Sequence, residues 1–295
     1  MKIINCLATL CLAVALSACA KGQKKIDAWS KVYAEQTAGR EATLGTAEDG
    51  QQSAQEVADG KHGRAGEVQE LEIPAPLKGL PEQILRRVGY TVSYNNSTRQ
   101  PNWVAWHLTA AHTTGPYKRG GIKFHEDEEV PVPRAVDWDY ARSGYDRGHM
   151  CPSGDNKWSE QAQEESFLFT NICPQNGGLN RGDWNEMEQQ CRRWAKEYGD
   201  IYIVCGPIFY KGKHKTIGSN KVAVPDAFFK VVLCMKGTPK AIGFVYKNVE
   251  GNRPKDSYVN TVDEVERITG FDFFPALPDR VENKVEAACN WNDWK

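Results

Sequence analysis

From about residue 81 onward, hydrophobic residues fall into short runs that favour β-strands over long helices. Five runs rich in β-branched and aromatic residues predict strands at Tyr90–Tyr94, Asn102–Leu108, Ile201–Cys205, Phe228–Met235 and Ala241–Tyr246. Too few predicted helices alternate with these strands for a doubly wound parallel sheet. We therefore expect an α+β fold, with helices packed on a mostly antiparallel sheet.

Three stretches have helical spacing or helical end signals, at Glu160–Ser166, Asn180–Tyr198 and Val262–Thr269. Thr261 followed by Glu264 gives the last one a capping pattern. The second has the clearest apolar face, which we expect to pack on the sheet. This face consists of Trp184, Met187, Cys191, Trp194, Ala195 and Tyr198.

The first 80 residues differ from the rest. Residues 1–18 combine a basic residue, a short apolar run and small residues, which is the pattern of a secretory signal. Leu16-Ser17-Ala18-Cys19 resembles a bacterial lipobox, in which the cysteine is lipidated and becomes the mature N-terminus. The alternative is a cleaved signal beside an ordinary cysteine. In both cases we expect export, and with a lipid on Cys19 a membrane-anchored lipoprotein on the periplasmic or cell-surface side.

Residues 19–80 are rich in Ala, Gly, Glu and Gln and show little apolar periodicity, which predicts a flexible tether before a domain spanning 81–295. Within that domain, 28 Lys and Arg balance 28 Asp and Glu. The balance argues against a strongly basic DNA-binding domain. A local basic stripe is still allowed, at residues 211–221 or at Arg192 and Arg193, although either could be a solvated surface.

The chain has nine cysteines, and the six beyond Cys19 are an even number that permits up to three disulfides in an oxidising compartment. Those in apolar runs could equally be buried thiols. No Cys-x-x-Cys pair supports a zinc ribbon. The six are Cys151, Cys173, Cys191, Cys205, Cys234 and Cys289.

One polar motif, Tyr-Asp-Arg-Gly-His at residues 145–149, precedes the predicted helix that begins at Asn180. His149 is suited to act as a base, because an ordinary histidine with a pKa of roughly 6.5 is mostly neutral at pH 7. Arg147 and Arg119 are permanent cations suited to phosphate. The carbonyl oxygen of Asn180 suits a hydrated Mg²⁺ better than zinc. These are the parts needed to hydrolyse a phosphodiester.

Glu188 lies on the same predicted helix as Asn180. In a continuous helix, the two side chains would lie within roughly 80° of each other but about 12 Å apart along the axis. They could not share an inner metal shell unless the helix begins later. Glu188 could instead reach the waters of a hydrated ion, or be a solvated carboxylate.

Three segments resemble, in order and spacing, the motifs of the DNA/RNA non-specific endonuclease family. They are residues 145–150 (Tyr-Asp-Arg-Gly-His-Met), residues 170–175 (Thr-Asn-Ile-Cys-Pro-Gln) and Asn180 with Trp184 and Glu188. The resemblance runs from about Tyr90 to Pro278. It implies a ββα-metal finger: two short strands followed by a helix that begins at the metal-binding asparagine.

The resemblance also implies individual roles. His149 matches the general base, and Asn180 matches the single direct ligand of Mg²⁺, for which Mn²⁺ can substitute. Asn171 matches an asparagine that orients the site, and Glu188 a carboxylate that holds metal-bound water. The implied phosphate contacts are Arg147 and Arg119. We also expect Asp146 to orient the motif by hydrogen bonding.

Two motif positions depart from the family pattern, because Cys151 and Cys173 stand where small or polar residues are expected; they could form a disulfide beneath the site. The family implies a Mg²⁺-dependent endonuclease that cuts DNA and RNA through backbone contacts and leaves 5′-phosphates. The alternatives are an inactive nucleic-acid-binding lipoprotein and a structural envelope lipoprotein. Intact His149, Asn180 and Glu188 argue against both. The preference between DNA and RNA, and a homodimer, are left open.

Overall fold

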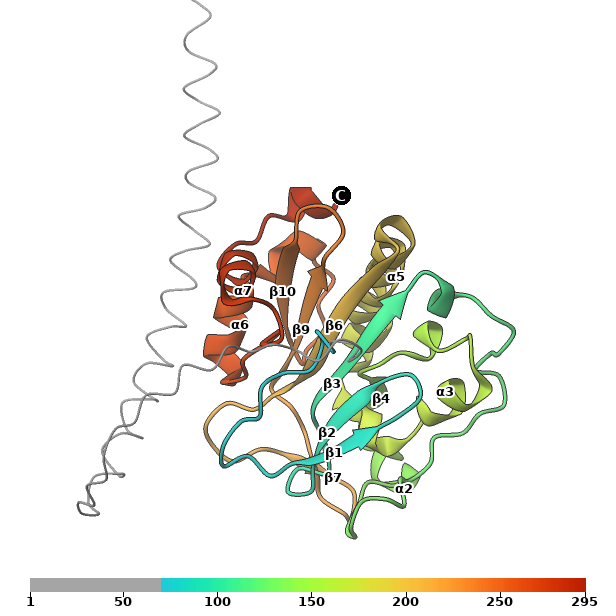
Figure 1. The fold of residues 1–295 in the computed structure, drawn as a ribbon. Helices are drawn as coiled ribbons and strands as arrows, with labels where there is room; N and C mark the ends of the chain where they lie inside the picture. Colours follow the sequence, from blue (N-terminus) through green and yellow to red (C-terminus); the bar gives the residue numbers. More distant parts are fainter. Residues whose placement is uncertain (1–69) are drawn as a thin grey trace, which may run out of the picture. The chain divides into compact units, whose positions relative to one another are not determined.

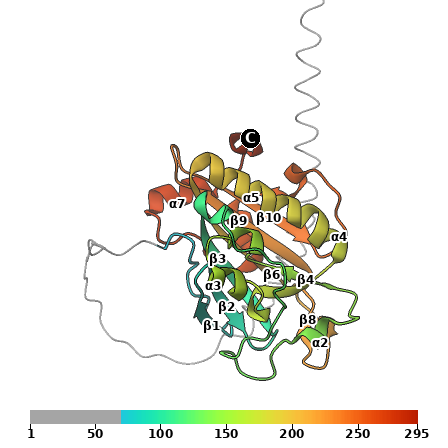
Figure 2. The ribbon, with the colours of Figure 1, turned by 90° about the vertical axis from the view of Figure 1, so that its right-hand side faces the viewer.

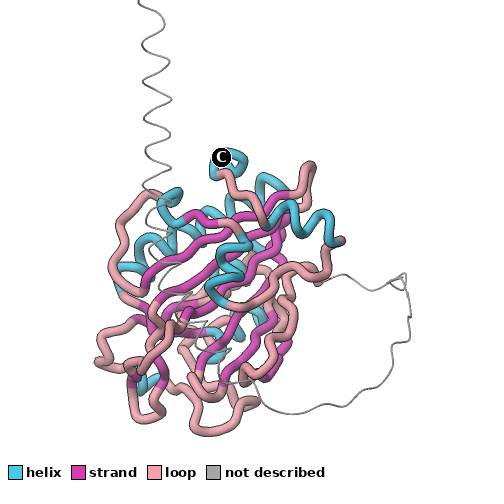
Figure 3. The backbone as a smooth tube through the Cα atoms, turned by 90° about the vertical axis from the view of Figure 1, so that its left-hand side faces the viewer, coloured by secondary structure: helices cyan, strands magenta, loops and turns pink. Residues whose placement is uncertain are grey.

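The computed structural model describes residues 70–295, which form one large antiparallel sheet with helices on both faces (Figure 1). The expected signal segment, Cys19 and most of the expected tether lie outside these residues. In spatial order, the strands of the sheet are β1 (Gln83–Arg86), β2 (Thr91–Asn95), β3 (Gln100–Thr109), β6 (Asp200–Ile208), β9 (Ala227–Cys234), β10 (Lys240–Lys247) and β11 (Val259–Asn260). Figure 3 shows them side by side, and every neighbouring pair is antiparallel. The predicted fold class and the five predicted strands are confirmed.

Two small ribbons accompany the sheet: β4 (Asp146–His149) pairs with β5 (Ile172–Gln175), and β7 (Thr216–Ile217) pairs with β8 (Val222–Ala223). The α-helices are α2 (Asp137–Tyr140), α3 (Glu160–Glu165), α4 (Gly177–Leu179), α5 (Asn185–Tyr198), α6 (Val262–Thr269) and α7 (Asp279–Glu286). Short 3₁₀ turns lie at Ala111–Thr113, Ser153–Asp155, Phe169–Asn171, Lys255–Tyr258 and Trp291–Trp294. Within the described part of the chain, none of these helices has the length and apolar character needed to span a membrane.

Different helices cover the two faces of the sheet. On one face lies α5, which crosses the strands in Figure 2 and buries the apolar side that its spacing predicts. On the other face lie α6 and α7. Adjacent residues of a strand point to opposite faces, so Phe228 joins the core under α5 and Phe229 the core under α6 and α7. Burial of both faces explains why β9 is almost uniformly apolar.

The chain already packs on the domain about ten residues before residue 81, where we expected the domain to begin. Leu71 is buried in the core on the α6 side, and the backbone nitrogen of Ala75 donates to the carbonyl of Asp272 at 2.9 Å. This segment forms neither a helix nor a strand. Its apolar residues are therefore buried without any periodicity that a sequence pattern could reveal.

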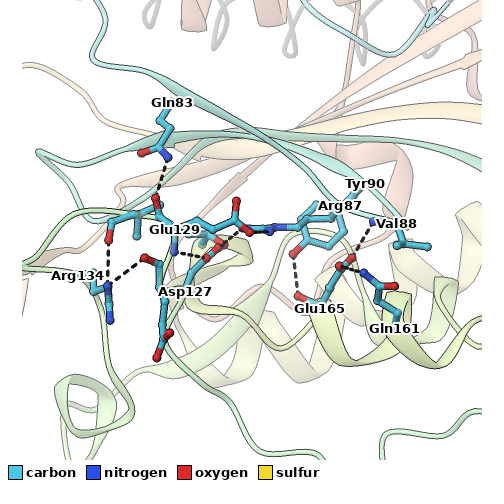
Figure 4. A network of polar contacts seen from close by, with 12 residues as sticks. Gln83, Arg87, Val88, Tyr90, Asp127, Glu129, Arg134, Gln161 and Glu165 are labelled. Carbon is cyan, nitrogen blue, oxygen red and sulfur yellow. Dashed lines mark hydrogen bonds and ion pairs between the residues drawn. The ribbon is translucent and has the colours of Figure 1, made fainter.

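A partly buried ion-pair network joins the β1–β2 turn to the loop before α2 (Figure 4). The side chain of Arg87 is only 7% exposed and contacts both Asp127, at 2.6 Å, and Glu129. Asp127 also accepts a hydrogen bond from Thr170 Oγ1 at 2.7 Å. Because Thr170 immediately precedes Asn171, this network supports the segment that leads into β5.

Candidate active site

The β4–β5 ribbon holds the polar motif in place. His149 is opposite Ile172, and Gly148 is opposite Cys173. Position 148 requires glycine, because a Cβ there would lie 2.6 Å from Cβ of Gln175. The chain then continues from β5 through α4 into α5, which gives the strand–strand–helix order that the family resemblance implies.

The helix predicted over Asn180–Tyr198 is not continuous. Asn180–Trp184 forms a π-helical turn, within which Gly182 has φ −98° and ψ −112°, outside the helical region. Glycine accepts such angles because it lacks a Cβ. The regular helix α5 therefore begins only at Asn185. Asn180 and Glu188 therefore do not belong to one continuous helix, and both line the same cleft.

That cleft has a volume of about 580 Å³. His149, Asn180 and Glu188 line it together, and Glu188 is the one carboxylate among its lining residues. Six permanent cations also line it: Lys118, Arg119, Arg147, Lys157, Arg181 and Arg192. The cleft is thus strongly basic although the domain as a whole is neutral, which suits a polyanionic ligand.

His149 has the environment of a neutral imidazole. Its Nε2 atom is buried and has no hydrogen-bond partner among residues 70–295. Burial lowers the pKa of His149 to about 3, with a further contribution from Arg119. Trp184 holds the strand at this point, because its Nε1 donates to the carbonyl oxygen of His149 at 3.1 Å. A neutral ring with an unused nitrogen can accept a proton.

Asp146 orients Asn180, as expected from the motif. The Nδ2 atom of Asn180 donates to Asp146 Oδ2 at 3.0 Å, and Arg181 donates to both oxygens of the same carboxylate. An ionised carboxylate can only accept hydrogen bonds, so Asp146 must face the Nδ2 atom of Asn180 and not its side-chain oxygen. The carbonyl oxygen of Asn180 accepts no hydrogen bond from the described residues. It is therefore available to a cation.

Arg147 and Arg119 both line the cleft but differ in their partners. Arg147 donates to Asp137 Oδ1 at 2.8 Å and to the carbonyl oxygen of Asp137 at 3.1 Å. Arg119 lies over the ring of Phe167 at 5.6 Å and has no ion-pair partner among the described residues. Arg119 is therefore the freer of the two to bind an anion.

Asn171 does not line the cleft. It is fully buried, and its Nδ2 donates to the carbonyl oxygens of Cys151 and Ser166, both at 2.8 Å. Its Oδ1 accepts from the backbone nitrogen of Cys151 at 2.9 Å. Since backbone groups occupy this side chain, Asn171 is a positioning residue that fixes the chain just after His149, and not a group that reaches a ligand.

Behind Glu188 lies a buried lysine that the sequence patterns did not single out. Burial raises the pKa of Glu188 to about 7, although Lys230 and Arg192 oppose the rise. Lys230 is 1% exposed, and its ammonium lies 4.4 Å from the ring centre of Trp184 and 5.1 Å from that of Trp106. The sequence did contain one sign of this lysine, because Lys230 is the single charged residue in the otherwise apolar strand β9.

Of the two predicted basic stripes, only one contributes a residue to the cleft. Arg192 lines the cleft and pairs with the buried Asp155 at 2.8 Å. Neither Arg193 nor residues 211–221 are among the residues that line it. Sequence reasoning instead missed three of the cleft cations, which no motif marks. They are Lys118, Lys157 and Arg181.

The suggested disulfide between Cys151 and Cys173 is wrong, since all six cysteines beyond Cys19 are free thiols. Cys151 instead accepts a hydrogen bond from Asn156 Nδ2 at 3.3 Å. Both thiols are fully buried, and burial raises the pKa of each well above its usual value. They serve as small core residues beneath the site.

Comparison with known proteins gives the same assignment from independent observations. The family profile of the DNA/RNA non-specific endonucleases matches residues 71–280. The mitochondrial nuclease EXOG of Danio rerio is 38% identical over 218 residues, which are 68% of this chain and 64% of that protein. Nuclease C1 of Cunninghamella echinulata var. echinulata is 36% identical over 215 residues, 68% of this chain and 85% of that protein.

The fold is also shared. In the solved EndoG/EndoGI complex, one chain superposes with a TM-score of 0.67 and 29% identity, over 75% of this chain and 96% of that one. The chain spans less than two thirds of the EXOG relatives, 64% in Danio rerio and 60% in Xenopus laevis. The profile match and these relatives show that the chain belongs to the DNA/RNA non-specific endonuclease family.

Proposed function

We propose that this protein is a Mg²⁺-dependent endonuclease that hydrolyses phosphodiester bonds in DNA and RNA and leaves 5′-phosphates. The observation that carries the proposal is the convergence of His149, Asn180 and Glu188 in one basic cleft. Membership of a family whose named relatives are nucleases supports it.

His149 acts in this proposal as the general base. Its neutral ring takes the proton of the attacking water, as a general base does. Arg119 and Arg147 hold phosphate oxygens and offset the negative charge that grows in the transition state. Because these cations address the phosphate backbone, the proposed cleavage has little sequence preference.

Asn180 would be the direct ligand of the metal ion, and Glu188 would hold one of the ion's waters. The donor set fits Mg²⁺, because both residues offer oxygen atoms and the carbonyl oxygen of Asn180 has no other partner among residues 70–295. Mn²⁺ accepts the same kind of ligands. When bound, the ion would supply charge neutralisation at the scissile phosphate.

We further propose that the protein is exported and anchored by a lipid on Cys19. This part rests on the lipobox-like sequence, which lies outside the described residues. Export would separate an unselective nuclease from the nucleic acids of the cell that makes it.

A plasmid-nicking assay on the purified protein tests the enzymatic proposal, with and without EDTA and with a structured RNA in parallel. We expect nicked and then fragmented products in Mg²⁺ and no cleavage in EDTA. Gel-shift binding of both nucleic acids without cleavage in any divalent metal would instead indicate an inactive binding protein. Cleavage that is unaffected by EDTA would refute the metal assignment.

A further inference from the structure

Three carboxylates converge on the face of the sheet opposite α5. Asp263 and Glu266 belong to α6, and Glu286 is the last residue of α7. One oxygen from each lies within 4.8 Å of the other two. The helices that carry them pack on the sheet beside one another, on the opposite side from α5 in Figure 1.

Glu286 points to a ligand independently of this clustering. It is only 6% exposed, and its Oε1 atom is buried without a hydrogen-bond partner among the described residues. An ionised carboxylate that is buried without a partner is strongly destabilising, so such a group either keeps its proton or is paired with a cation or a metal. The side chain that lacks a partner is also the one that closes the three-carboxylate cluster.

The charged groups that act most strongly on Glu286 are all acidic. Burial raises the pKa of Glu286 to about 9, and Glu266, Glu282, Asp263 and Asp272 raise it further. Burial likewise raises the pKa of Glu266 to about 7. At pH 7 Glu286 therefore holds its proton, and a cation that binds to the cluster displaces it; no basic group is among those that act most strongly on Glu286.

We propose that Asp263, Glu266 and Glu286 form a structural Ca²⁺ site. Ca²⁺ binds carboxylate oxygens at about 2.3–2.6 Å, so two of its ligands can lie as far as about 5 Å apart. The three oxygens lie within 4.8 Å of one another, so they can share one ion of this kind. Ca²⁺ accepts several carboxylates in a flexible shell, whereas Mg²⁺ usually binds one or two carboxylates and keeps several waters. Three carboxylates therefore favour Ca²⁺.

The surroundings suit a hydrated ion held from one side. Asp263 is exposed, which leaves room for water ligands, while Glu286 closes the buried side. The backbone nitrogen of Phe273 donates to Oε1 of Glu266 at 2.7 Å and fixes that carboxylate. A bound Ca²⁺ links α6 to α7 and stabilises the helical layer on this face, without contact with the cleft around His149.

Equilibrium dialysis of the purified full chain against ⁴⁵Ca²⁺ tests the site, in an Asn180→Ala background that removes the proposed ligand in the cleft. We expect one Ca²⁺ per chain, no measurable binding by Glu286→Gln, and at least tenfold weaker binding by Asp263→Asn. Asp279→Asn, which changes an exposed carboxylate at the start of α7, is the matched control and should bind normally. Absence of binding, or equal binding by all variants, overturns the proposal.

Thermal unfolding gives a second readout that does not depend on nuclease activity. At a free Ca²⁺ concentration about 100-fold above Kd, the Tm should rise by roughly 5 to 10 °C. Glu286→Gln should show no such rise, yet be at least as stable as the unsubstituted chain in EDTA, because the substitution removes a buried carboxylate. A Glu286→Gln protein that is less stable in EDTA and gains the full rise in Ca²⁺ would contradict the site. Asp263→Asn keeps the test valid if Glu286→Gln fails to fold.

Discussion

Asn180 donates a hydrogen bond through its Nδ2 to Oδ2 of Asp146 at 3.0 Å. Burial raises the pKa of Asp146, but hydrogen bonds from Arg181 and Asn180 outweigh it, so the pKa falls below its ordinary value and the carboxylate stays ionised. Asp146 and His149 are the two ends of β4. One short strand therefore positions both the base and the residue proposed to bind the metal.

Replacing Asp146 with leucine should free the Asn180 amide to rotate. We expect the Mg²⁺ concentration for half-maximal activity to rise about 10- to 100-fold, as is usual when the partner of a metal ligand is lost. Arg181→Gln is the matched control, because it removes the ion pair but keeps the Asn180–Asp146 hydrogen bond. An equal shift in the Mg²⁺ titration for both variants would remove Asp146 from this role.

His149→Ala should lower kcat by about 10²- to 10⁴-fold, the usual share of a general base. His107→Ala is the control, since His107 pairs with Asp200 at 2.9 Å and is not among the residues that line the cleft. Steady-state cleavage of a labelled duplex measures both. Comparable losses in the two variants would point to a general effect on folding.

The Mg²⁺ requirement should depend on pH through Glu188. Burial raises the pKa of this carboxyl to about 7, against the opposing effects of Lys230 and Arg192. Below that pH Glu188 is protonated, and a protonated carboxyl holds the waters of the cation less strongly. Between about pH 8 and 6, the half-maximal Mg²⁺ concentration should rise, approaching tenfold per unit at the acid end. His149 stays neutral over this range, because its pKa is about 3. Glu188→Gln should flatten the dependence, and an unchanged slope would exclude Glu188 as its source.

Asp127→Ala should lower the free energy of unfolding by about 1 to 3 kcal/mol, because it removes one of the two carboxylate partners of Arg87 and the acceptor of Thr170 Oγ1. Arg86→Ala removes a pair with Glu70 whose side chains are 60% and 45% exposed, and should cost at most about 1 kcal/mol. Urea unfolding followed by tryptophan fluorescence measures both changes. Similar losses of unfolding free energy in the two variants would mean that the Asp127–Arg87 pair stabilises the fold no more than an exposed ion pair does.

Cys19→Ser should abolish incorporation of a radioactive fatty acid into the protein expressed in a bacterial host. Unmodified Cys6 and Cys11 lie in the expected signal segment, so Cys6→Ser serves as a control that keeps the label. Labelling that persists in Cys19→Ser would refute lipidation at this residue.

The sequence was most informative where one periodicity dominated. Strands such as β9 are buried on both faces, and α5 buries one continuous stripe, so their patterns follow directly from solvent exclusion. The break at Gly182 could not be predicted in this way. A glycine does not interrupt the helical spacing of the apolar residues around it, and only the backbone angles show that the helix is broken there. Because of that break, Asn180 lies on the turn before α5 and Glu188 on α5 itself.

Other features arise only from contacts between distant segments. Lys230 lies between Trp106 and Trp184, which are brought to it by β3 and by the turn before α5. Asn171 matched a family position, yet its burial under backbone groups could not be inferred from residue type. The failed disulfide is of the same kind, since a motif gives sequence position and not the direction in which a thiol points.

Gly182 also divides the site into two mechanical parts. Asn180 lies on the turn that is bonded to β4, whereas Glu188 moves with α5. A shift of α5 along the sheet would carry the carboxylate with it while the amide stays in place. Substitutions on the apolar side of α5 can thus change the position of Glu188 without disturbing the hydrogen bond between Asn180 and Asp146.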